Sequence, residues 1–137
     1  MTNVTVATIL KGYHKIILTL SDVNINNRYR LQIFGGNMIR NLELAFIKLH
    51  ILYHASKEEV FGIGLVEELD RHGYAIGPGT LYPTLAKMVK GGFLTCEART
   101  VDHKQRKYYR TTPSGLALLN KMKMKITELH QEVIEER

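Results

Sequence analysis

The sequence has a single cysteine, Cys96, and no apolar run of the roughly 18 residues that a membrane-spanning helix needs. One cysteine excludes an intramolecular disulfide and any zinc site built from several thiolates. Lys11, His14 and Lys15 interrupt the weakly apolar N-terminus, which therefore lacks the unbroken apolar core of a signal peptide. We expect a cytoplasmic protein without a membrane partner, in which Cys96 is a small strand side chain rather than a redox group.

The motifs of common enzyme classes are missing as well. The chain has no Walker phosphate-binding loop, no dinucleotide-binding glycine motif and no evident pair of nucleophile and base. His50 and His54 have the spacing of two metal ligands on one helix, but no HExxH motif surrounds them and no third ligand is evident. We therefore predict that the protein is not an enzyme and carries no cofactor or metal.

Composition and charge are more informative about what the chain does. With 45% hydrophobic and 23% charged residues, the 137-residue chain is expected to fold as one domain with appendages. Its formal net charge is +6, and residues 99–110 include five basic side chains against Asp102 alone. A basic cluster on a turn favours a polyanionic partner, although a solvated loop has the same composition.

Residues 1–36 are the least informative part of the chain. Alternating apolar residues within 4–20 are compatible with strands, and the polar, asparagine-rich stretch Ser21–Arg30 indicates a loop. Gly35 and Gly36 indicate a boundary. We treat 1–36 as an N-terminal extension of unknown role.

A helix is predicted directly after this boundary. Asn37 is its expected N-cap, and the helix is expected to end near Ala55. Its apolar residues recur at spacings of three and four, which places them in one stripe: Leu42, Phe46, Leu49 and either Leu52 or Tyr53. A helix this apolar in a small domain is expected to serve both the core and a partner chain.

A second helix is predicted to follow, with Ser56 as its cap. Glu58 and Glu59 are then expected in its first turn, where carboxylates interact favourably with the helix dipole. Gly73 is the expected C-terminal cap. Residues 74–76 are predicted to form a small third strand beside the hairpin that comes later in the chain.

The next stretch predicts a short helix that ends at Gly91. Either Thr80 caps this helix or Pro78 is its first residue. Leu81, Leu85 and Met88 share the core face, and the residues outside that face are Thr80, Tyr82, Pro83, Thr84 and Lys87. Tyr82 has two interpretations: an exposed phenol that packs on sugar and donates to phosphate, or a rim residue of the core.

A basic hairpin and a last helix complete the sequence. Strands are predicted at 93–100 and 107–112, with a tip at 101–106 that has no glycine and is therefore expected to be longer than a tight two-residue turn. Thr112 is the expected cap of the last helix, in which apolar residues alternate at spacings of three and four. Two arrangements account for that stripe: a symmetric dimer seam or packing on the chain's own domain.

Three segments together resemble the PadR-type transcriptional regulators. They are GTLYPTLAKM (Gly79–Met88), GGFL (Gly91–Leu94) and RKYYRTTPSG (Arg106–Gly115), in the order of the family's recognition helix, first wing strand, second wing strand and start of the last helix. The resemblance covers roughly 38–137. It implies a dimeric winged-helix DNA-binding protein, usually a repressor, whose first and last helices dimerise.

We therefore predict a mainly α fold with a small antiparallel β wing: a winged helix-turn-helix domain at 37–112 and a C-terminal dimerisation helix at 113–137. The predicted function is a homodimeric, sequence-specific repressor on double-stranded DNA that a small-molecule effector relieves. The alternative is a protein-interaction module that binds an acidic partner. The predicted DNA-binding residues are Thr80, Tyr82, Pro83, Thr84, Lys87, Lys104, Arg106, Lys107 and Arg110. The predicted dimerisation residues are Leu42, Phe46, Leu119, Met122, Ile126, Leu129 and Val133.

Overall fold

The computed structural model describes residues 26–137, with side-chain surroundings from residue 35 onward. The strands expected within 4–20 lie outside the described residues. The chain divides into two compact units, Met1–Leu42 and Glu43–Arg137. Helix α1 belongs to both units, and every later element lies in the second one. None of the described helices combines the length and the apolar character needed to span a bilayer.

Helix α1 spans Asn26–Lys57 and is longer than the sequence predicted. The loop predicted at Ser21–Arg30 is wrong for residues 26–30, and the boundary predicted at Gly35 and Gly36 is wrong, because the helix continues through both. Each glycine costs the helix about 1 kcal/mol relative to alanine, yet extending an existing helix is much cheaper than starting a new one. Asn37 is therefore an interior residue and not a cap.

The connection after α1 also differs from the prediction. Ser56 lies inside α1, where its hydroxyl donates to the Tyr53 carbonyl at 2.6 Å, so it does not cap the next helix. Strand β1 (Val60–Phe61) comes before α2 (Gly62–Arg71), whose N-cap residue makes no side-chain cap hydrogen bond. Glu58 and Glu59 consequently precede β1 instead of forming the first helical turn.

The end of α2 agrees with the predicted glycine cap. Gly73 has φ +84°, and its N–H donates to the Asp70 carbonyl at 2.9 Å. A left-handed residue at this place is a common way to satisfy the last helical carbonyls. The third strand predicted at residues 74–76 is wrong, because β1 pairs with the hairpin instead.

Helix α3 spans Pro78–Lys90. Of the two predicted starts, the one with Pro78 as the first helical residue is confirmed. Gly77 is the N-cap residue and Pro78 occupies the first turn. A backbone N–H at this position would have no intrahelical acceptor, so proline costs the helix no hydrogen bond here. Pro83 lies inside the helix. The helix ends at Gly91, as predicted, and Gly92 follows with φ +79°.

Strands β2 (Leu94–Val101) and β3 (Lys104–Thr111) form an antiparallel hairpin, and β1 pairs with the other edge of β3. The predicted long tip is wrong: Asp102 and His103 alone connect the strands, with φ +50° and +61°. Two successive left-handed residues make the tight turn that matches strand twist. Aspartate and histidine enter this region more readily than most residues, so no glycine is required.

Helix α4 (Pro113–Leu129) continues as the π-helical segment η2 (His130–Ile134). Its predicted cap is confirmed, since the Thr112 hydroxyl accepts a hydrogen bond from the Gly115 N–H at 3.0 Å. The Thr112 hydroxyl also donates to the Gly92 carbonyl at 2.6 Å. The cap thus links the start of α4 to the turn between α3 and β2.

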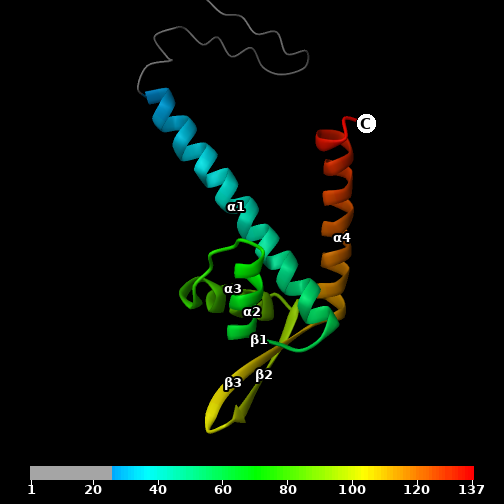
Figure 1. The fold of residues 1–137 in the computed structure, drawn as a ribbon. Coiled ribbons are helices and arrows are strands. Elements are labelled where there is room, and N and C mark those ends of the chain that lie inside the picture. The colour runs from blue at the N-terminus through cyan, green and yellow to red at the C-terminus, as the bar shows by residue number, and fades with distance from the viewer. Residues whose placement is uncertain (1–25) are drawn as a thin grey trace, which may run out of the picture. The chain divides into compact units, whose positions relative to one another are not determined.

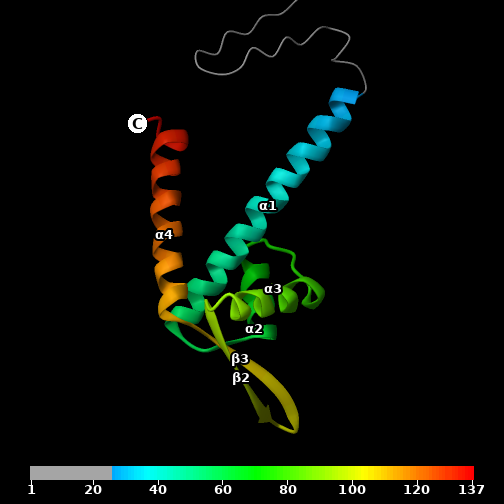
Figure 2. The same cartoon turned by 180° about the vertical axis from the view of Figure 1, so that it is seen from behind.

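The core of the second unit takes residues from four helices and two strands. Its buried members are Ile47, Ile51, Leu52, Ala55, Leu65, Leu69, Ile76, Leu81, Leu85, Met88, Leu94, Tyr109 and Leu119. The predicted core face of α3 is therefore confirmed. The hairpin projects from one end of the unit and α4 extends from the other (Figures 1 and 2). This mainly helical fold with a small antiparallel sheet is the winged-helix arrangement that the sequence predicted.

Candidate nucleic-acid interface

Helix α3 presents a polar face opposite its buried one. Tyr82, Pro83 and Lys87 are exposed, and 41% of Tyr82 is accessible to solvent. Thr80 and Thr84 are half-buried, and the Thr84 hydroxyl donates to the Thr80 carbonyl at 2.8 Å. The structure therefore exposes Lys87 and part of Tyr82 on this face and puts the two threonines at its edge.

Gly62, the first residue of α2, is what makes room for the Tyr82 ring. A Cβ atom at Gly62 would lie 2.6 Å from Cζ and 2.8 Å from Cε1 of Tyr82. Contacts this short do not occur between real atoms, so only glycine allows the present position of the phenol. The sequence indicated close packing at Gly62 but not its partner, because no local signal links residues 62 and 82.

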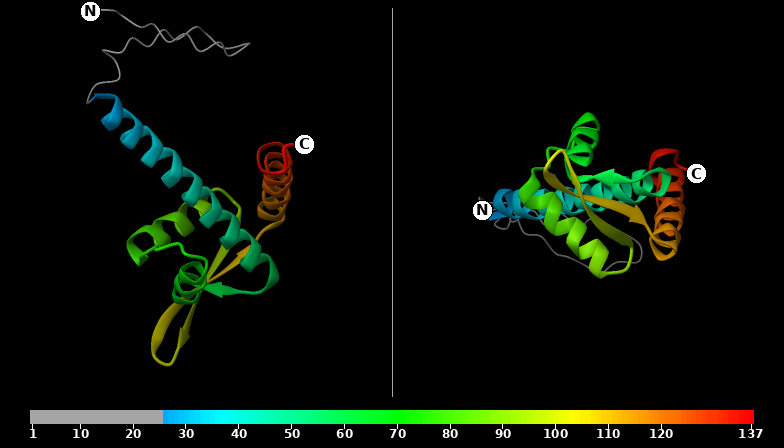
Figure 3. Two further views of the ribbon diagram at one scale, coloured as in Figure 1. Left: turned by 45° about the horizontal axis from the view of Figure 1, so that its top comes forward. Right: turned by 90° about the horizontal axis from the view of Figure 1, so that it is seen from below.

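The predicted basic residues of the hairpin do not share one face. Side chains alternate along a strand, so the register of β3 puts Lys104, Arg106 and Arg110 on one face. Lys107 lies on the other face, the one on which Tyr109 enters the core. Seen from the end at which the hairpin projects, α3 lies in view together with both strands (Figure 3, right). Helix α3 leads through residues 91–93 directly into β2, so its C-terminal end lies beside the base of the hairpin.

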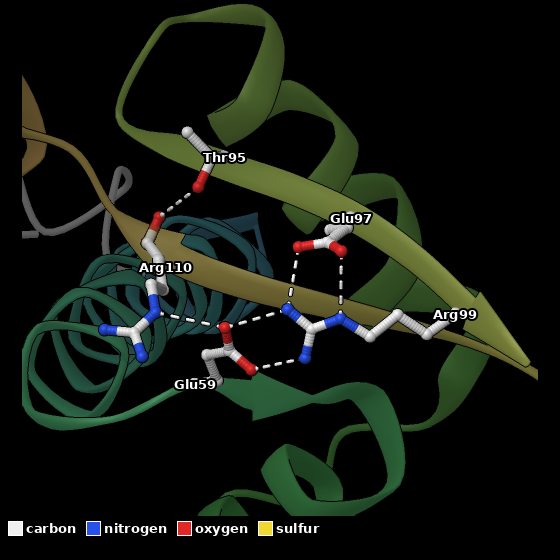
Figure 4. Close-up of polar contacts among 5 residues, drawn as sticks. All are labelled: Glu59, Thr95, Glu97, Arg99 and Arg110. Atoms are coloured by element: carbon white, nitrogen blue, oxygen red, sulfur yellow. Dashed lines mark hydrogen bonds and ion pairs between the residues drawn. The ribbon is translucent and has the colours of Figure 1, made fainter. Parts of the chain in front are cut away.

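Two of the basic side chains in residues 99–110 are held by carboxylates of the same chain. Glu59 accepts from Arg99 at 2.7 and 3.0 Å and from Arg110 at 3.2 Å (Figure 4). Arg99 also donates to Glu97 at 2.7 and 3.0 Å and lies 4.8 Å from the centre of the Tyr108 ring. Arg110 was predicted to contact DNA; the structure gives it a carboxylate partner instead of an unpaired charge.

The other predicted basic residues of the hairpin have no such partner. Among the side chains that the structure describes, no carboxylate pairs with Lys104, Arg106 or Lys107. Arg106 lies over the Phe61 ring at 5.7 Å from its centre. The uncompensated positive charge of the hairpin is therefore at its tip, not along its whole length.

The carboxylate of Glu59 makes the stability of the sheet depend on pH. Hydrogen bonds from Arg99 and then Arg110 lower the pKa of Glu59 to about 2 from its usual 4.5. A depressed pKa stabilises the folded state above pH 4.5, and this contribution is lost as the pH falls from 4.5 to 2. We predict that Glu59→Gln lowers the melting temperature at pH 7 and that the difference from the unchanged protein disappears near pH 2.

The melting temperatures of both proteins are measured by thermal denaturation across this pH range. Glu58→Gln is the matched control, because this neighbouring carboxylate is exposed and pairs with no cation among the described side chains. Equal melting temperatures for Glu59→Gln and the unchanged protein at pH 7 would show that the ion pairs contribute nothing to stability.

The residues predicted for dimerisation fall into two groups. Leu119 is only 1% exposed and belongs to the chain's own core, so it is not available to a partner, and half-buried Met122 packs against that core. Farther along, 38% of Ile126 and 52% of Leu129 are exposed. The remaining members are exposed Leu42 and Val133 and half-buried Phe46. Packing on the chain's own domain therefore accounts for the start of this stripe, and its later members are exposed in the single chain.

Comparison with known proteins identifies the family to which this chain is similar. The family model described as "Transcriptional regulator PadR-like family" matches residues 51–121. Transcriptional regulator Rv3488 of Mycobacterium tuberculosis is 46% identical over 96 residues, which cover 70% of this chain and 90% of that protein.

Solved structures agree with the sequence match. A PadR family transcriptional regulator from Eggerthella lenta has a TM-score of 0.65 and 29% identity, covering 78% of this chain and 95% of that one. A PadR-like transcriptional regulator from Bacillus cereus has a TM-score of 0.60 and 30% identity, covering 66% of this chain and 90% of that one. With more than half of its length matched and a winged-helix fold in place, the chain belongs to the PadR-like family of DNA-binding transcriptional regulators.

Proposed function

We propose that the protein is a homodimeric repressor that binds a specific site on double-stranded DNA. Two copies of α3 enter successive major grooves, and the hairpin tips contact the adjacent backbone or minor groove. The observation that carries this proposal is the exposed face of α3, with Tyr82 and Lys87, on the helix that leads directly into the hairpin, where Lys104 and Lys107 pair with no described carboxylate.

The polar atoms of this face suit a duplex. The Tyr82 phenol offers a donor for phosphate and a flat surface for sugar, and Lys87 adds a positive charge on the last turn of α3. Lys104 and Lys107 extend the positive surface on the two faces of the hairpin. Phosphate contacts of this kind position a protein on DNA, whereas base contacts from α3 select the sequence.

Dimerisation is supported by the apolar side chains that α4 leaves uncovered. Ile126 and Leu129 continue the stripe beyond the core at helical spacing, and exposed Val133 follows in η2. A second copy of the same helix is the simplest partner for such a stripe, because a two-fold interface is formed by the same surface patch on both chains. The dimer fixes the distance between the two copies of α3.

Repression and its relief complete the proposal. The PadR-like family implies a repressor, and an effector bound between the dimerising helices and the DNA-binding unit would change the spacing of the two α3 helices. Such a ligand shifts the population between spacings only by as much as its affinity for them differs. A ligand that releases the protein from DNA must therefore bind the DNA-free arrangement more tightly.

The wing is tested by the salt dependence of DNA binding. We expect Lys104→Ala combined with Lys107→Ala to weaken binding to all duplexes alike. The slope of log affinity against log salt should fall by about 0.9 for each phosphate that the wing no longer neutralises. Fluorescence anisotropy on a duplex from the gene's own upstream region measures both quantities. Lys48→Ala, an exposed lysine of α1, is the control. An unchanged slope would remove the wing from the interface.

Gly62 provides a test of the Tyr82 contact. We predict that Gly62→Ala displaces the Tyr82 ring and weakens DNA binding about tenfold with little change in melting temperature, because the group that must move is an exposed side chain. The same substitution in a Tyr82→Ala background should have no further effect on affinity. If it costs the same factor in both backgrounds, Gly62 does not act through Tyr82.

A further inference from the structure

Three histidines that are separated in the sequence converge on one side of the second unit. His50 and His54 lie one turn apart on α1, and His72 is the C-cap residue of α2. Each offers one ring nitrogen, and these nitrogens all lie within 4.8 Å of one another. The His50 and His72 rings are stacked with their centres 4.4 Å apart. The third ligand that the sequence did not reveal is therefore His72.

A carboxylate completes the group. Oε1 of Glu68 lies 3.2 Å from Nε2 of His72 and 3.5 Å from Nε2 of His54. Its other oxygen, Oε2, lies 3.3 Å from Arg71, a contact that orients the carboxylate with Oε1 toward the rings. Glu68 and His72 are also one turn apart on α2, so two adjacent helices each supply two ligands.

We propose that His50, His54, His72 and Glu68 bind one divalent transition-metal ion, of which zinc is the representative, and that the ion ties α1 to α2. In a tetrahedral zinc site the ligand atoms lie about 2.0–2.2 Å from the metal and so roughly 3.4 Å from one another. Glu68 lies 3.2 Å from His72 and 3.5 Å from His54, and the histidine nitrogens lie within 4.8 Å of one another, so these separations bracket that value.

The kinds of ligand define the class of ion. Three imidazoles and one carboxylate suit zinc, cobalt, nickel and copper, whereas magnesium and calcium require oxygen ligands. Tyr74 meets His50 edge-on, with ring centres 5.4 Å apart, and limits the orientations of the ring.

A plain ion-pair cluster is the competing interpretation, since Glu68 already faces Arg71 and two imidazoles. The metal-site interpretation predicts that replacing His72 weakens Zn²⁺ binding, whereas the ion-pair interpretation predicts no such effect. This side chain is 44% exposed, so its replacement by alanine should leave the fold intact. The proposal concerns binding alone and does not rest on the proposed repressor function.

Calorimetry with Zn²⁺ on the chelator-treated full chain tests the proposal. We expect one ion per chain, at least tenfold weaker binding for His72→Ala and for Glu68→Gln, and no response to Mg²⁺. His130→Ala, which changes an exposed histidine of η2, is the control and should bind as the unchanged protein does. Co²⁺ should give the strong visible absorption of a tetrahedral site, and this absorption should be absent in His72→Ala.

Two results would overturn the proposal. One is Zn²⁺ binding of equal strength in the unchanged protein and in His72→Ala, which would place the ion elsewhere. The other is the absence of both Zn²⁺ heat and Co²⁺ absorption in the unchanged protein. If His72→Ala fails to fold, as judged by its melting curve, His54→Gln takes its place in the comparison, with the same weakening expected.

Discussion

Leu129→Asp is expected to convert the dimer into a monomer and to weaken binding to the specific DNA site by about a hundredfold or more. The side chain is 52% exposed in the isolated chain and lies in the middle of the uncovered apolar stripe of α4. A carboxylate placed there would be buried without a partner at the proposed interface. A monomer then has one α3 helix for one half-site and loses the gain of linked binding, which is typically 10²–10⁴.

Sedimentation equilibrium gives the mass, and anisotropy gives the DNA affinity. Met124→Asp is the matched control: it introduces the same charge on an exposed apolar residue, about 140–160° around the helix from Leu129 and Ile126. It should remain a dimer. A Leu129→Asp protein that stays dimeric and binds DNA normally would place the seam elsewhere.

Gly115→Ala is expected to destabilise the fold by about 3 kcal/mol and to lower the melting temperature by on the order of 10 °C. In an open helix the same change would stabilise by up to about 1 kcal/mol. Here an added Cβ would collide with the main-chain carbonyl of Phe93 and would lie 2.8 Å from Cγ2 of Thr111. That carbonyl also accepts from the Thr112 N–H at 3.1 Å, so it is not able to move away without breaking a hydrogen bond.

The control for Gly115→Ala is Ser114→Ala, an exposed position in the same turn of α4, where little change is expected. Denaturant melts of the three proteins give the free energies of unfolding. A Gly115→Ala protein as stable as the unchanged one would mean that the start of α4 is able to move away from Phe93.

Elements with local signals could be predicted from the sequence. The core face of α3, the glycines that end α2 and α3, and the Thr112 cap each depend on residues within a few positions of one another. Helix periodicity and capping preferences describe that range well. The order of the second, third and fourth helices and of the hairpin followed from these signals together.

The features that the sequence did not reveal depend on distant residues. Strand β1 consists of two residues and exists because β3 supplies its partner, so no period marked it in advance. Glu59 was assigned to a helical turn, yet Arg99 and Arg110 hold it at the edge of the sheet. His72 joins His50 and His54 only when α2 folds against α1.

Two further differences are local but concern exceptions to a rule. The hairpin turn uses Asp102 and His103 in left-handed conformations where glycine or asparagine is the usual residue. Helix α1 continues through Gly35 and Gly36, which ordinarily mark an end. In both places the strands or the helix on either side determine the backbone conformation, against the usual conformational preference of the single residues.

In the proposed complex, two chains place two α3 helices on one DNA site. The most direct measurement titrates the purified protein into a labelled duplex from its own upstream region, at roughly 0.15 M salt, with a shuffled duplex as competitor. We predict saturation at two chains per duplex and a preference of at least a thousandfold over the shuffled sequence. Saturation at one chain per duplex would rule out binding as a dimer, and equal affinity for the two duplexes would rule out a specific site.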